Sequence, residues 1–69
     1  MNIRKAATEA ARIIRRGNRA NVMADGSVWE STGTFGLIAD GEQKYPIWYN
    51  RSNLTVAEIS KQLRAVLER

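Results

Sequence analysis

The chain has 69 residues, a formal charge of +4, and neither cysteine nor histidine. This length allows one domain with little stability to spare, since chains this short bury only about 60% of their unfolded surface. The missing cysteines and histidines exclude disulfides and the usual zinc sites, and they remove the side chains most used in nucleophilic and acid–base catalysis. We therefore expect a single small domain that is not an enzyme and uses no cofactor or metal.

The chain also lacks the signals of membrane targeting. No apolar run approaches the roughly 20 residues that a membrane-spanning helix needs. The basic N-terminal stretch is not followed by the apolar segment of a signal peptide. We therefore expect a cytoplasmic protein with neither a membrane nor a small-molecule substrate among its partners.

The first predicted element is a helix over residues 3–16. Apolar side chains recur there every three or four positions on one stripe, from Ile3 to Ile14, and Asn2 is a candidate N-cap. The opposite face is basic. Residues 1–19 hold six cations against one acid, whereas residues 20–50 hold four acids against one cation. A basic helix therefore precedes a mildly acidic middle segment.

The middle of the chain predicts an antiparallel sheet. We expect strands over residues 19–24, 27–39 and 43–49, joined by two Ala-Asp-Gly turns whose glycines suit the left-handed position of a hairpin loop. In the long second strand the odd positions carry Trp29, Phe35 and Leu37 in phase, which favours three strands in a meander with a bend at a glycine. The alternative splits this strand at residues 31–33, which gives four strands. Pro46 places the last strand at an edge.

The last predicted element is a helix over residues 55–68. Thr55 and Glu58 have the spacing of a capping box, and Leu54 with Ile59 makes the matching hydrophobic staple. The predicted fold is thus α+β, in the order α-β-β-β-α, with a three-stranded antiparallel meander, or four strands, packed against two helices. Either both helices cover the apolar odd face of the sheet, or each helix covers one face.

This order of elements is similar to that of double-stranded RNA-binding domains and of the small RNA-cleaving toxins that share their layout. The resemblance covers nearly the whole chain, in topology alone. RNA-binding members open their last helix with a lysine cluster, where this chain has Thr55-Val-Ala-Glu58, and the toxins use a histidine.

Two functions fit these features. In the first, a nucleic acid or nucleoprotein is bound through the basic surface, in a salt-sensitive mode without base readout. In the second, the protein is a small inhibitor or adaptor of the kind found in phages and mobile elements, and it binds an acidic protein surface. Homodimerisation is compatible with both. The candidate binding residues are Arg4, Lys5, Arg12, Arg15, Arg16, Arg19 and Arg51, and the candidate apolar interface is Trp48 with Ile38 and Val28. The alternative for Trp48 is a place in the core.

Overall fold

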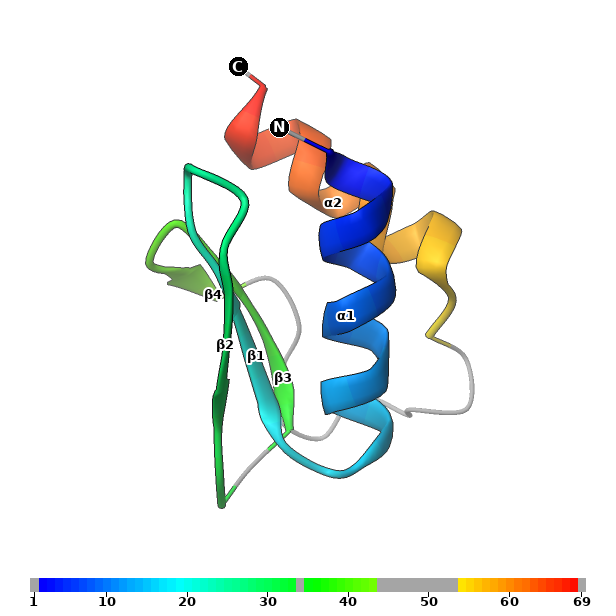
Figure 1. The fold of residues 1–69 in the computed structure, drawn as a ribbon, viewed down its shortest axis with the longest axis vertical. Coiled ribbons are helices and arrows are strands. Elements are labelled where there is room, and N and C mark those ends of the chain that lie inside the picture. The colour runs from blue at the N-terminus through cyan, green and yellow to red at the C-terminus, as the bar shows by residue number, and fades with distance from the viewer. Residues whose placement is uncertain (1, 34, 44–53, 69) are drawn as a thin grey trace.

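The computed structural model of the chain describes residues 2–33, 35–43 and 54–68. These residues form two helices and four strands (Figure 1). The elements are, in chain order, α1 (Ile3–Arg15), β1 (Arg19–Val22), β2 (Val28–Ser31), β3 (Gly36–Ala39), β4 (Glu42–Gln43) and α2 (Val56–Leu67). The predicted α+β class, with a helix before and a helix after the strands, is confirmed.

Both helices begin at the caps that the sequence predicts. The Asn2 Oδ1 atom accepts a hydrogen bond from the Lys5 N–H at 3.0 Å, and the Thr55 Oγ1 atom accepts one from the Glu58 N–H at 3.1 Å. Each bond satisfies one of the first-turn N–H groups that have no partner within the helix. These local bonds fix where α1 and α2 start, and therefore which side chains each helix turns outward.

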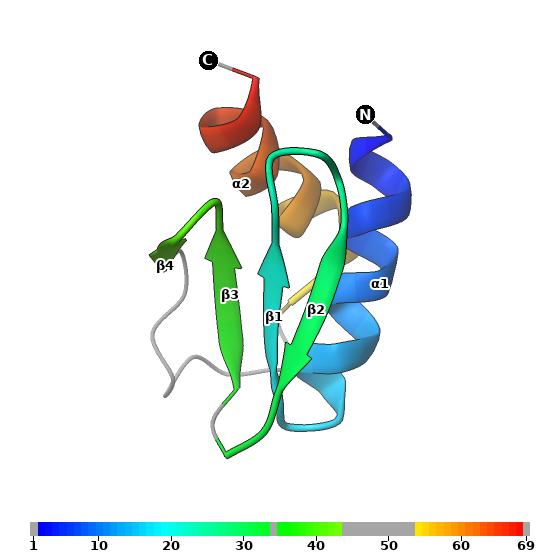
Figure 2. The ribbon, with the colours of Figure 1, turned by 60° about the vertical axis from the view of Figure 1, so that its left-hand side comes forward.

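The sheet differs from the predicted meander. Its strand order is β2-β1-β3-β4, in which β1 pairs antiparallel with β2 and parallel with β3, and β3 pairs antiparallel with β4. The split into four strands is therefore the alternative that the structure adopts. Gly33, with φ +103°, follows β2, and β3 lies along the other edge of β1 from β2 (Figure 2). The topological resemblance to double-stranded RNA-binding domains does not extend to this mixed sheet.

The break between β2 and β3 also changes which residues face the helices. Val22 is fully buried and lies opposite Val28, so Val28 points to the helix side and Trp29 to the other. In β3 the fully buried residues are Leu37 and Ala39. The prediction that Trp29 and Leu37 face the same side of the sheet is therefore wrong. Trp29 is 65% exposed. Because the segment between the strands does not stay extended, alternation cannot be carried across it.

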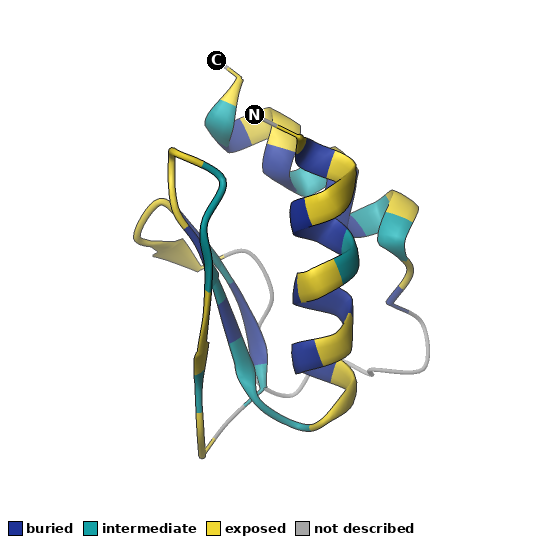
Figure 3. Ribbon diagram, viewed as in Figure 1, coloured by how far each residue is buried: buried dark blue, intermediate teal, exposed yellow. Residues whose placement is uncertain are grey.

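Both helices lie on one face of the sheet, which gives a two-layer fold (Figures 1 and 2). Helix α1 packs on α2 and on strands β1 to β3, and α2 packs on α1 and β3. The core lies between the layers, with the alanine-rich side of α1 turned inward and its polar side exposed (Figure 3). Alanine at these positions lets α1 approach the sheet closely, and the other side of α1 is left exposed.

Several predictions concern residues outside this description. The predicted strand over residues 43–49 lies, beyond Gln43, outside the described residues, as do Pro46, Trp48 and Arg51. Among the described residues, no helix is long and apolar enough to cross a membrane.

Candidate functional site

The exposed side of α1 carries a row of positive side chains. At about 100° per residue, four cations of α1 and its C-cap residue Arg16 fall within an arc of about 120°. All five are exposed, and we call them the cationic face of α1: Arg4, Lys5, Arg12, Arg15 and Arg16. The face exists because the seven buried residues of the helix occupy the other side, from Ile3 to Ile14. The sequence predicts this clustering correctly.

Two carboxylates balance part of this face. The Arg12 Nη1 atom lies 3.4 Å from the Glu9 Oε2 atom, in a pair whose side chains are both at least half exposed. Such an exposed pair contributes little stability and opens readily to another anion. The second carboxylate, Glu30, receives two hydrogen bonds from Arg16, at 2.8 and 3.3 Å, and a further one from the Asn18 side-chain amide.

The Arg16–Glu30 pair joins the end of α1 to β2. Its two parallel bonds have the forked geometry that makes arginine–carboxylate pairs specific. Glu30 can reach Arg16 because it lies on the helix side of β2, opposite the buried Ala20. Arg16 thus holds the helix against the sheet and is less available to an outside anion than the other members of the face.

The pH dependence of stability should report this pair. Hydrogen bonds from Arg16, and next from Asn18, hold the pKa of Glu30 below its usual value. A depressed pKa means that the folded state gains stability from Glu30 above the usual pKa and loses it as the pH falls below about 4. We expect Glu30→Gln to lower the melting temperature modestly at pH 7 and hardly at pH 3. A difference between the two proteins that does not shrink with falling pH would contradict this role.

The remaining candidates do not join the cationic face. Arg19 begins β1, half-buried, and its register with Ser31 and Gly36 places it on the sheet face turned away from the helices. The predicted apolar interface is also divided. Val28 packs against the core, whereas Ile38, in register with Asn21, lies on the opposite face of the sheet. These two residues cannot form one patch, and Trp48 lies outside the described residues.

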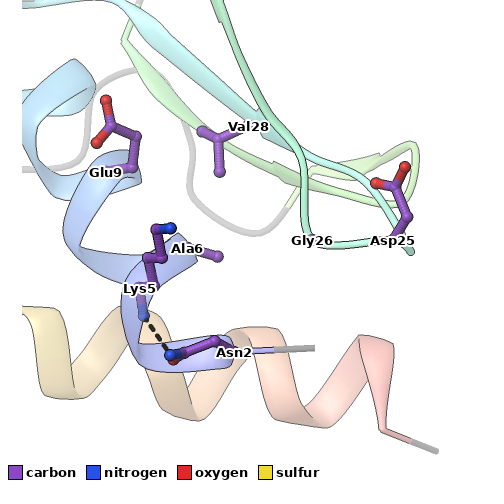
Figure 4. A pocket seen from close by; sticks show the side chains of 7 residues that line it. All are labelled: Asn2, Lys5, Ala6, Glu9, Asp25, Gly26 and Val28. Carbon is purple, nitrogen blue, oxygen red and sulfur yellow. Dashed lines mark hydrogen bonds between the residues drawn. The ribbon is translucent and has the colours of Figure 1, made fainter.

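A cleft of about 440 Å³ separates the first half of α1 from the β1–β2 loop (Figure 4). Lys5 and Glu9 line it from the helix, Asp25 and Gly26 from the loop, and Ala6 and Val28 between them. The Asp25 carboxylate accepts hydrogen bonds from the Ser27 N–H and hydroxyl, at 2.9 and 2.7 Å, and these bonds lower its pKa. With two carboxylates against one lysine, the inside of this cleft does not favour an anion, although Lys5 at its rim also belongs to the cationic face.

A second groove, of about 230 Å³, lies between the two helices. Arg4 lines it from α1, and Val56, Ala57, Ser60 and Arg64 line it from α2. Sequence reasoning missed the α2 contribution. The available signal was Ser60, a polar residue directly after Ile59 on the stripe that α2 buries.

Comparison of the chain with protein-family models, with curated proteins and with solved structures found no match. The chemistry of the site therefore has to be inferred from its own residues. Within the described part of the chain, no three potential metal ligands of the His, Cys, Asp and Glu types lie together. What the arrangement offers is a set of exposed guanidinium and ammonium groups, which bind oxyanions.

Proposed function

We propose that this protein binds nucleic acid through the cationic face of α1, by contacts to backbone phosphates and without base readout. The observation that carries the proposal is the concentration of five exposed cations on one side of α1 and its C-cap, where Glu9 pairs with Arg12 and Glu30 with Arg16. Phosphate contacts from arginine and lysine supply most of the affinity of non-specific nucleic-acid binding.

The dimensions of the face suit this role. Arg4 and Arg16 are twelve residues apart, so the face is about 18 Å long at 1.5 Å per residue. Each strand of a duplex presents a phosphate about every 3.4 Å along the helix axis, so about five phosphates of one strand fall within that length. Because carboxylates share part of the face, we take about three to four net contacts as the expected number.

The fold itself does not require these charges. Helix α1 has no acidic residue in its first turn, where Arg4 and Lys5 stand instead. Cations at a helix N-terminus oppose the helix dipole, at a cost of about 0.3–1 kcal/mol each. A sequence that keeps them there, on an exposed surface, is consistent with selection for an anionic partner.

Because of this cost, one substitution separates binding from folding. We expect Lys5→Glu to stabilise the fold by about 0.3–1 kcal/mol, since it places a negative charge at the N-terminus of α1. The same change should weaken binding to a 20-base-pair duplex about tenfold at 0.1 M salt, because one phosphate contact is lost. Thermal melting measures the first effect and fluorescence anisotropy the second.

The matched control is Lys61→Glu. Lys61 is an exposed lysine in the middle of α2, so this variant has the same change in net charge at a position outside the cationic face. We expect it to weaken binding clearly less than Lys5→Glu does. Equal losses in the two variants would mean that net charge alone, and not the face of α1, governs binding.

The other candidate partner is an acidic protein surface. The wild-type protein alone distinguishes it from a nucleic acid, in a retention experiment with nuclease treatment. Retention of nucleic acid that nuclease treatment abolishes supports the proposal. No retention of DNA or RNA at 50 mM salt, together with nuclease-resistant capture of a protein, would overturn it.

A further inference from the structure

The groove between α1 and α2 differs from the rest of the positive surface in how its charges are balanced. Arg4 and Arg64 both line it, one from each helix, and both are exposed. Neither makes an ion pair with a carboxylate of the described residues, whereas Arg12 and Arg16 each have one. Two like charges that meet across a groove repel one another unless an anion lies between them.

The groove also contains a buried polar group. Ser60 is only 6% exposed and is the one polar residue in the buried core of the described chain. Its hydroxyl makes no hydrogen bond to the described residues and can therefore donate to a group that enters the groove. Ser60 lies one helical turn before Arg64 and one turn after Val56. Val56 is the first residue of α2, so the groove begins at the N-terminal end of this helix, which carries the positive end of the helix dipole.

Acidic side chains line the other side of α1. Glu9 and Asp25 line the cleft toward the β1–β2 loop, and Glu30 is held by Arg16. An anionic chain that follows the cationic face is therefore repelled from the loop side. It is drawn toward the side of α1 that Arg4 shares with α2.

We propose that this groove is a seat for one backbone phosphate, in which Arg4 and Arg64 clamp the phosphate oxygens and the Ser60 hydroxyl donates a hydrogen bond. The proposal rests on the proposed function and extends the interface from α1 to α2. Two guanidinium forks and one hydroxyl are donors of the kind that bind the two non-bridging oxygens of a phosphodiester. Room is sufficient, since 230 Å³ is several times the volume of about 30 Å³ that one water occupies in the liquid.

The test compares Arg64→Gln with Lys61→Gln, which removes one positive charge from the same exposed helix but does not line the groove. Binding to a 20-base-pair duplex is followed by anisotropy over a range of salt. We expect Arg64→Gln to weaken binding about tenfold at 0.1 M salt and to reduce the salt slope by about one, and Lys61→Gln to do much less. Equal effects of the two variants would overturn the phosphate seat while leaving the proposed function intact.

A second variant, Ser60→Ala, separates binding from folding. Removing an unpartnered buried hydroxyl should leave the melting temperature unchanged or raise it, and the affinity should fall severalfold. An affinity equal to that of the wild type would contradict the role of Ser60. If the wild-type protein retains no nucleic acid at all, the proposed function fails, and a titration with inorganic phosphate then decides the seat. A shift of the Ser60 amide NMR signal that Arg64→Gln abolishes supports it, and the absence of any shift overturns it.

Discussion

Replacement of Leu37 by alanine is expected to remove most of the stability of this protein. The Leu37 side chain is fully buried on the helix side of β3, beside Ala20 in the parallel register with β1. Truncation of a buried leucine costs about 2–5 kcal/mol, from lost burial and from the cavity left behind. A domain of this size rarely has more than about 3–5 kcal/mol in total. We therefore expect a chain that is largely unfolded at 37 °C, as measured by circular dichroism during urea and thermal unfolding.

The neighbouring residue provides the control. Ile38 lies on the opposite face of the sheet and is only half-buried, so Ile38→Ala should cost clearly less than Leu37→Ala. The order of the two effects tests the phase of β3 directly. A larger loss for Ile38→Ala would mean that the side chains of this strand face the other way.

The helices could be predicted because their signals are local. The caps at Asn2 and Thr55, and the spacing of apolar residues behind them, lie within a few positions of the structure that they specify. The cationic face of α1 follows from the same periodicity. For this reason the part of the candidate site that belongs to one helix could be predicted from the sequence.

The sheet could not be predicted because its pairing depends on contacts distant in sequence. The turn signals are correct, and Gly26 and Gly41 do adopt left-handed conformations, with φ values of 91° and 84°. Whether β3 pairs with β2 or crosses to the free edge of β1 is decided by packing against the helices. The unbroken alternation from Trp29 to Leu37 favoured one long strand and was misleading.

The parts of the site that join two elements were missed for the same reason. Glu30 is 14 positions from Arg16, and the pair forms only because β2 turns Glu30 toward the helices. The groove between Arg4 and Arg64 depends on how α2 crosses α1, which no local pattern specifies. Sequence periodicity thus predicted the cationic face of α1. It predicted neither the Glu30 carboxylate that pairs with Arg16 nor the contribution of α2 to the groove.

The second prediction with a large expected effect is the salt dependence of nucleic-acid binding. About three to four phosphate contacts give a slope of about −3 to −4 for the logarithm of the binding constant against the logarithm of the salt concentration, at about −0.9 per phosphate on duplex DNA. Between 50 and 200 mM salt the affinity should then fall about 100-fold. The dependence arises because each contact releases condensed counterions, a gain that shrinks as the salt concentration rises.

This slope is the most direct test of the central claim, that the exposed side of α1 is a surface for phosphates. The measurement is anisotropy of a labelled 20-base-pair duplex, titrated with the wild-type protein at several salt concentrations between 50 and 200 mM. We predict binding at the lowest salt and a slope of about −3 to −4. Absence of binding at 50 mM salt, or a slope shallower than about −1, would contradict the account.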